Sequence, residues 1–274
     1  MVDLSPDHGS LGKPVMSPRM MAPSSNKKRR CEGRSRAQEL QEDTPIVYKN
    51  RSPPRNVQSI KVHPSVITIP DGKFKNLEQL QCVELCEGIQ KIGKDAFMGC
   101  SDLKVVKLCK GIQLLQAAGP LLNTRSQTGG IGSKAFQGCF ALEMVEVPST
   151  LLEIQSKGFT CCTALKVVKL CEGIKDIGEE AFEHCHRLER IYIPSTVLEI
   201  RGRVCRDCWA LKEVKLHEGL RGIGDEAFRD CRSLERVEIP STVMHIGSRA
   251  FTSCWDLMEV VLCEGMQNIG EEAF

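Results

Sequence analysis

One spacing constrains this sequence more than any other feature. A cysteine recurs every 23 residues from position 139 to position 254, and Cys100 precedes the first of the series by 39 residues, which is 23 plus 16. A fixed period over this length predicts an array of stacked repeats, rather than the two domains that 274 residues would otherwise suggest. The regularly spaced cysteines are Cys139, Cys162, Cys185, Cys208, Cys231 and Cys254.

Each repeat carries the same order of residues after its cysteine. Apolar residues recur three, six and eight positions on, as in Leu188, Ile191 and Ile193, and the last two alternate with polar residues, which predicts a strand with one buried face. A turn follows, then a short extended piece around an isoleucine, and then the segment Ala-Phe-x-x-Cys, whose spacing predicts a short helical turn. We therefore expect an α/β solenoid with one parallel sheet and short helical turns on the other side.

The complete pattern, L-x-x-V-x-[IL]-P-S-T-V-x-x-I-G-x-x-A-F-x-x-C, resembles the BspA-like class of leucine-rich repeats. This resemblance implies a curved right-handed solenoid that serves as an interaction module, and it carries over no catalytic residues. Members of the class occur in bacterial surface proteins and in intracellular proteins of single-celled eukaryotes. Three departures stand out: Val204-Cys205 replaces Ala-Phe, Gly158 replaces Ala, and the chain stops at Phe274 before the next expected cysteine.

The period divides the chain into two parts. Residues 57–274 fit about nine repeats, interrupted by an insert at roughly 113–128 that we expect to leave the solenoid as a loop. Residues 1–56 hold seven of the thirteen prolines and no apolar period, which predicts a disordered, basic, Pro-rich tail. Because the last repeat is incomplete, we expect an uncapped C-terminal end, either of a fragment or of a chain that self-associates end to end.

Charged residues alternate in sign from repeat to repeat at the outward positions of the predicted strand. In a parallel stack, residues one period apart are neighbours, so these columns place lysine beside glutamate. Two interpretations follow: a face that neutralises itself and keeps the repeats in register, which we favour, or a charged surface that recognises a partner. The candidate partner-binding residues are Lys166, Lys169, Glu189, Tyr192, Lys212, Lys215, Glu235 and Glu238.

The cysteines also raise the question of metal binding. We expect the regularly spaced cysteines to be buried as small hydrophobic residues, because phenylalanine and leucine flank them. One column, Cys161, His184 and Asp207, places a thiol, an imidazole and a carboxylate one period apart, and is the candidate for a metal site or a catalytic relay. Since no deep pocket or oxyanion donor is implied beside it, we expect no metal, no cofactor and no catalytic residue.

The N-terminal tail contains a compact basic run, made up of Lys27, Lys28, Arg29 and Arg30. Such a run is typical of a nuclear import signal or of a weak phosphate-binding patch, so we expect nucleic acid to bind only weakly, through the tail. The start of the chain lacks the apolar run of a signal peptide, and no stretch approaches about 18 consecutive apolar residues. These observations predict an intracellular protein, cytoplasmic or nuclear, that does not enter a membrane.

Two functions from different classes remain open at this point. The first is a non-enzymatic scaffold that binds another protein through the strand face, the insert or both. The alternative is a nuclear or nucleic-acid-associated accessory protein that is targeted by its basic tail. A cysteine- or zinc-dependent enzyme is the third and least favoured interpretation.

Overall fold

The computed structural model describes residues 45–108, 129–262 and 264–274. All of them lie in one compact unit, Glu42–Phe274. The basic run at 27–30 and the predicted insert at 113–128 lie outside the described residues.

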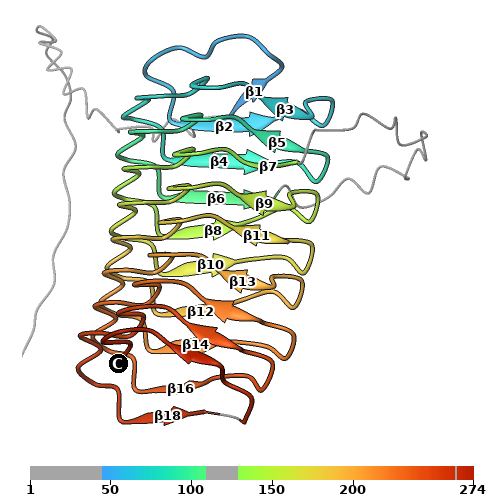
Figure 1. Ribbon diagram of the computed structural model, residues 1–274. Coiled ribbons are helices and arrows are strands. Elements are labelled where there is room, and N and C mark those ends of the chain that lie inside the picture. The colour runs from blue at the N-terminus through green and yellow to red at the C-terminus, as the bar shows by residue number, and fades with distance from the viewer. Residues whose placement is uncertain (1–44, 109–128, 263) are drawn as a thin grey trace, which may run out of the picture. The chain divides into compact units, whose positions relative to one another are not determined.

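The described chain is a parallel β-solenoid in which each turn contributes one longer strand and one strand of two residues (Figure 1). The longer strands form what we call the long-strand face: β1 (Ile46–Tyr48), β2 (Ser59–Val62), β4 (Cys82–Leu85), β6 (Val105–Leu108), β8 (Met144–Glu146), β10 (Val167–Lys169), β12 (Arg190–Tyr192), β14 (Glu213–Lys215), β16 (Arg236–Glu238) and β18 (Glu259–Val261). The others form the short-strand face: β3 (Thr68–Ile69), β5 (Lys91–Ile92), β7 (Gly130–Ile131), β9 (Glu153–Ile154), β11 (Asp176–Ile177), β13 (Glu199–Ile200), β15 (Gly222–Ile223), β17 (His245–Ile246) and β19 (Asn268–Ile269).

Strands pair in parallel with their counterparts on the next turn, except β14 with β16 and β11 with β13. Val168 of β10 lies opposite Val145 of β8, so the register equals the 23-residue period of the sequence. On the long-strand face the pairing is continuous from β1 to β14, and β16 pairs separately with β18. On the short-strand face one sheet runs from β3 to β11 and another from β13 to β19. The prediction of one parallel sheet is therefore wrong, because strands line two faces and each face is divided into two sheets.

The stack begins earlier than the repeat period predicts. Tyr48 of β1 lies opposite Val62 of β2. The Tyr48 ring is buried and packs edge-on against Phe74, with ring centroids 4.8 Å apart. Residues 46–48 therefore form the first layer of the solenoid, although the predicted tail extends to residue 56.

The predicted helical turns and the α/β class are wrong, because the described residues contain no helix. At the corner between the two faces, Glu180 and His184 have left-handed backbone conformations, with φ of 58° and 60°, and these interrupt any helical geometry. Alternate amide groups point in different directions. The amide of Glu183 donates to the carbonyl of Glu180 at 3.2 Å, whereas that of Phe182 donates to Val204 of the next turn at 2.8 Å.

The bonds between turns at this corner form a third ladder, which we call the corner ladder. It is present at each turn, and its donors are the amides of Phe74, Phe97, Phe136, Phe159, Phe182, Cys205, Phe228 and Phe251.

The described residues also include no helix that is long and apolar enough to cross a membrane.

The core follows the sequence period closely. Most inward residues of both faces, the corner phenylalanines up to Phe251 and the regularly spaced cysteines from Cys100 to Cys231 are buried, as predicted. On the last turns Cys254 is only half-buried, and Ile269 and Phe274 are exposed. Phe136 stacks on Phe159 with ring centroids 5.0 Å apart, and the stack continues over several turns until Cys205 replaces a phenylalanine. Each of these thiols donates to a carbonyl of the preceding turn, as Cys185 does to Phe159 at 3.3 Å. The described cysteines are free thiols.

Candidate functional site

A hollow on the long-strand face lies where the sheet is divided, between β14 and β16. It has a volume of about 450 Å³. Its lining residues are Lys212, Glu213, Val214, Lys215, Leu216, Glu235, Arg236 and Glu238. The structure therefore brings four of the eight candidate partner-binding residues together here, and the other four lie on earlier turns.

Backbone hydrogen bonds show the same interruption. On the turn before the hollow, the amide of Lys212 donates to the carbonyl of Glu189 at 2.9 Å. On the turn after it, the amide of Met258 donates to Glu235 at 3.0 Å. Glu235 holds the equivalent position on the turn between them, and among the described residues its amide makes no such bond to β14. The facing edges of β14 and β16 are therefore left without their regular backbone pairing.

Charges on the earlier turns of this face are paired across the stack. Lys169 lies 2.7 Å from Glu146, and Lys166 lies 3.3 Å from Glu143. Lys107 likewise pairs with Glu84 at 3.0 Å. These contacts have the geometry of a self-neutralising face.

Charges around the hollow are arranged differently. Lys215 contacts Glu213 of its own strand at 3.5 Å, and its ammonium lies 4.8 Å from the ring centroid of Tyr192. Among the described residues, Glu189, Lys212 and Glu235 take part in no ion pair within 4.0 Å, even though they occupy one column on successive turns. The hollow is therefore bordered by charges of both signs that the protein itself does not neutralise.

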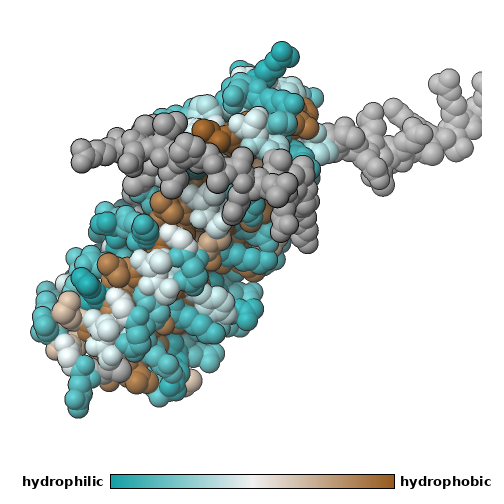
Figure 2. Space-filling model, turned by 90° about the vertical axis from the view of Figure 1, so that its right-hand side faces the viewer, coloured by the Kyte–Doolittle hydropathy of each residue, from teal (hydrophilic) through white to brown (hydrophobic). Residues whose placement is uncertain are grey.

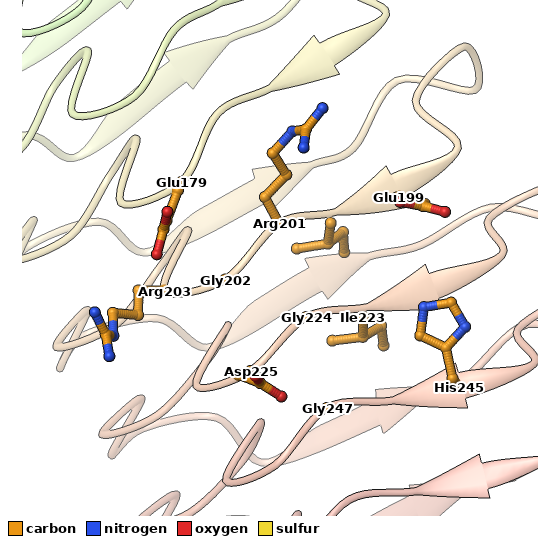
Figure 3. Close-up of a pocket in the computed structure, with 11 residues that line it drawn as sticks. Glu179, Glu199, Arg201, Gly202, Arg203, Ile223, Gly224, Asp225, His245 and Gly247 are labelled. Carbon is orange, nitrogen blue, oxygen red and sulfur yellow. The ribbon is translucent and has the colours of Figure 1, made fainter.

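Two further hollows lie on the short-strand face, with volumes of about 440 and 540 Å³, and both are lined by Glu199 and Arg201. Figure 3 shows Gly202, Gly224 and Gly247 between the charged side chains of the first hollow. A side chain at Gly224 is excluded, because its Cβ would lie 2.7 Å from the backbone nitrogen of Gly202. The backbones of successive turns approach so closely at Gly224 that only glycine fits there. The absence of side chains on these glycines leaves the first hollow open.

The second of these hollows lies at the division between β11 and β13. Arg201 spans the division, with Nε and Nη2 donating to the Asp176 carboxylate at 2.8 and 3.2 Å. This hydrogen-bonded pair raises the pKa of Arg201 and occupies its guanidinium. Figure 2 shows the edge of the solenoid at which turns join the two faces, with hydrophobic residues scattered among hydrophilic ones. We interpret Arg201 as a structural link between turns, which the sequence period alone does not reveal.

The candidate metal column is only partly assembled. His184 Nδ1 lies 3.5 Å from Asp207 Oδ2, and Cys161 occupies the preceding turn. All three have left-handed φ values, between 59° and 63°, which explains why glycine, asparagine and aspartate fill this column elsewhere. Burial, and secondarily the Glu183 carboxylate, raise the pKa of the Cys161 thiol, whereas a nucleophile or metal ligand needs a lowered one. Among the described residues, no group of three such side chains is placed to hold a metal ion.

Glu183 is a buried carboxyl group that the sequence analysis missed. Burial, and next the neighbouring Glu180 carboxylate, raise its pKa to about 7. Arg206 lies 3.9 Å away and opposes the shift. The positions one period before and after Glu183 hold Thr160 and Arg206. Because the residue type is not repeated, the sequence pattern gave no sign of a buried acid.

Known proteins share this fold. A leucine rich cell surface protein from Faecalibacterium prausnitzii is 23% identical, with a TM-score of 0.49 and coverage of 71% of this chain and 42% of that one, so the present chain spans less than half of that protein. A leucine rich repeat protein from T. pallidum is 22% identical, with a TM-score of 0.51 and coverage of 72% and 77%. The pneumococcal vaccine antigen PcpA is 22% identical, with a TM-score of 0.47 and coverage of 83% and 62%. No curated protein matches the chain.

These comparisons correct the predicted location. The prediction of an intracellular protein, cytoplasmic or nuclear, is wrong, because the similar proteins include one described as a cell surface protein. The nuclear alternative depended on that location and on residues 27–30, which lie outside the described part of the chain. It is therefore withdrawn.

The repeats themselves match a known family. The model for the BspA type leucine rich repeat region matches six copies, over residues 53–118, 122–209 and 194–274. These ranges cover most of the chain and agree with the 23-residue register between strands. The chain therefore belongs to the BspA type leucine rich repeat family.

Proposed function

We propose that this chain is a non-enzymatic scaffold that binds another protein through its long-strand face, centred on the hollow between β14 and β16. The observation that carries this proposal is the coincidence of three features at one place. The sheet is divided there, a hollow of about 450 Å³ opens, and Lys212 and Glu235 border it without ion pairs. Proteins of this repeat family are typically non-enzymatic and commonly bind proteins.

Binding of a partner costs less around the hollow between β14 and β16 than over the earlier turns of the long-strand face. A partner that binds over Lys169 must compete with Glu146, which already lies 2.7 Å from it. Lys212 and Glu235 offer charges whose pairing with a partner displaces only water. A protein segment with charges of both signs fits such a border, because like charges opposite one another would be repelled.

The direct test is site-specific photo-crosslinking on the full chain in extracts of its native source. A photoreactive residue replaces Lys212 in one variant and Lys166 in the control, since these two positions lie in the same column two turns apart. We expect a discrete cross-linked protein from position 212 and none from position 166. Equal labelling at both positions, or labelling at neither, contradicts the proposal.

A charge reversal then tests the chemistry of the contact. The double variant Lys212→Glu and Lys215→Glu should lower the yield of that cross-linked protein by about tenfold when the photoreactive residue is moved to position 235. The matched double variant Lys166→Glu and Lys169→Glu should leave the yield unchanged. An equal loss in both double variants would show that general charge, rather than the hollow, governs binding.

A further inference from the structure

A column of exposed and half-exposed residues runs beside the hollow, one position after each regularly spaced cysteine. We call it the edge column, and it consists of Phe140, Thr163, His186, Trp209, Arg232 and Trp255. It contains both tryptophans of the chain. Trp255 is 72% exposed and Phe140 is 55% exposed, so large apolar rings face solvent along this edge. Exposed aromatic residues and arginine are the residue types that dominate binding energy at protein interfaces.

Arg232 is held between the two indole rings of this column. Its guanidinium carbon lies 4.8 Å from the ring centroid of Trp209 on one neighbouring turn and 4.7 Å from that of Trp255 on the other. The opposite face of Trp209 is covered by His186, whose ring is parallel to the indole within 4° at a centroid distance of 3.8 Å. Both faces of the guanidinium are thus occupied, and its planar edge, which carries the N–H donors, is fixed in direction.

Among the described residues, this guanidinium makes one long ion pair and no hydrogen bond. Nη2 lies 3.7 Å from Oδ1 of Asp230, which is beyond hydrogen-bond distance. Nε is buried and has no hydrogen-bond partner among the described residues. Other arginines of the same region are engaged, as Arg236 is with Glu238 at 2.7 Å. Arg232 therefore combines a fixed orientation with Nη groups that make no hydrogen bond, whereas its buried Nε is out of a partner's reach. Preorganisation of this kind lowers the entropic cost of binding.

We propose that the edge of Arg232 is a preorganised receptor for a carboxylate of the partner, supplied by an acidic peptide segment. This inference rests on the proposed function, because Arg232 and Trp209 lie three residues before Glu235 and Lys212, which line the hollow. Because Nε is buried, the partner's carboxylate accepts one N–H bond from each Nη group, in an end-on bidentate pair. Trp255 and Met258, which is 83% exposed, provide apolar contacts beside that pair.

The surrounding charges favour a carboxylate over a phosphate. Asp230 is 3.7 Å from the guanidinium. On the neighbouring turn, Asp207 accepts a hydrogen bond from Trp209 Nε1 at 3.2 Å. Arg229 pairs with Asp230 and Arg206 with Asp207, each at 3.5 Å, so no surplus of positive charge surrounds Arg232 to hold a doubly charged phosphate. An acidic side chain of a protein is therefore the ligand that this site fits.

Tryptophan fluorescence reports on this site alone, because Trp209 and Trp255 are the two tryptophans of the chain. The test is a titration of the full chain with a capped oligoglutamate peptide, followed by tryptophan fluorescence. We expect a saturable change in emission, and a dissociation constant that rises by about tenfold or more in Arg232→Lys, which keeps the charge but loses the planar fork. The control Arg221→Lys, in the segment that leads into the short-strand face, should bind as the parent does.

Three results would overturn the inference. They are the absence of a saturable change in the parent, equal binding by Arg232→Lys, and tighter binding of a phosphoserine peptide of the same length than of oligoglutamate. Circular dichroism of Arg232→Lys checks that the variant is folded. Failure of this inference is distinguishable from failure of the proposed function, because the cross-link from position 212 would persist in Arg232→Lys if only the carboxylate receptor is wrong.

Discussion

The two halves of the long-strand face are built from the same repeat but join their turns differently. From β2 to β10 the sheet is continuous, and ion pairs such as Glu146 with Lys169 connect successive turns. Beyond β10 the pairing is uneven: it is a single residue pair between β10 and β12, three pairs between β12 and β14, and absent between β14 and β16. The corner ladder nevertheless runs through both halves. The corner ladder therefore connects all turns of the solenoid, whereas the strand pairing on the long-strand face varies from turn to turn.

This difference teaches how a repeat array can gain a binding surface without losing its fold. Where charges pair across turns, a column of lysine and glutamate serves register, and each exposed pair contributes little energy. Where the pairing is interrupted, the same residue types border a hollow, and Lys212 and Glu235 among them form no ion pair within the described residues, as the proposed function requires. We call the turns from β2 to β10 the paired half and those from β12 to β18 the open half. The substitutions below test whether the two halves differ only in their long-strand face.

The largest effect is expected in the shared core. Phe159→Ala in the paired half and Phe228→Ala in the open half should each lower the free energy of unfolding by about 3–5 kcal/mol, because both rings are fully buried in the corner stack. Chemical denaturation followed by circular dichroism measures both losses. A much smaller loss for Phe228→Ala would mean that the corner ladder is weaker in the open half, and the comparison would then extend beyond the face.

An intermediate effect is expected at Glu183, on the turn where the two halves meet. Its pKa is about 7 in the folded protein, above its ordinary value of 4.5. The folded state therefore holds a proton that the unfolded chain has lost, and stability falls as the pH rises from 4.5 to 7. Glu183→Gln should remove this dependence, which amounts to roughly 1–3 kcal/mol.

The measurement at Glu183 is the difference in unfolding free energy between parent and variant at several pH values. Glu189→Gln, an exposed position of the same turn, is the control and should follow the parent. A Glu183→Gln variant whose stability varies with pH as the parent's does would show that this carboxyl group is not protonated in the folded protein.

The smallest effect is the one that separates the two halves most sharply. A double-mutant cycle on Glu146 and Lys169, which lie 2.7 Å apart, should give a coupling energy of about 0.2–1 kcal/mol. The same cycle on Lys212 and Glu235 should give a coupling near zero, because these two residues form no ion pair. Equal coupling in both cycles would remove the distinction between a paired and an open half.

Much of this architecture follows from the period alone. The register, the buried cysteines and the alternation of lysine and glutamate on one face are all consequences of a 23-residue repeat. The prediction of short helical turns at the corner was wrong, because residues such as Glu180 and His184 adopt left-handed backbone conformations. Their residue types do not predict such conformations. The division between β14 and β16 also has no counterpart in the sequence, since its residues keep the repeat pattern on both sides.

The candidate site was predicted in part. The period places Lys212, Lys215, Glu235 and Glu238 on one face, but it cannot show which charges the protein neutralises by itself. A signal for the edge column was present, because Trp209, Arg232 and Trp255 are each one period apart. Only the distances in the structure show that their rings and guanidinium stack.

Amide hydrogen exchange on the full chain tests the central claim most directly. We predict that the amides of Glu235 and Arg236 exchange at least about tenfold faster than those of Lys166 and Val167, which donate to Glu143 at 3.0 and 3.2 Å. Two-dimensional NMR resolves these amides individually. Equal protection at the two places would mean that the sheet is continuous between β14 and β16, and that result would contradict an open half of the long-strand face.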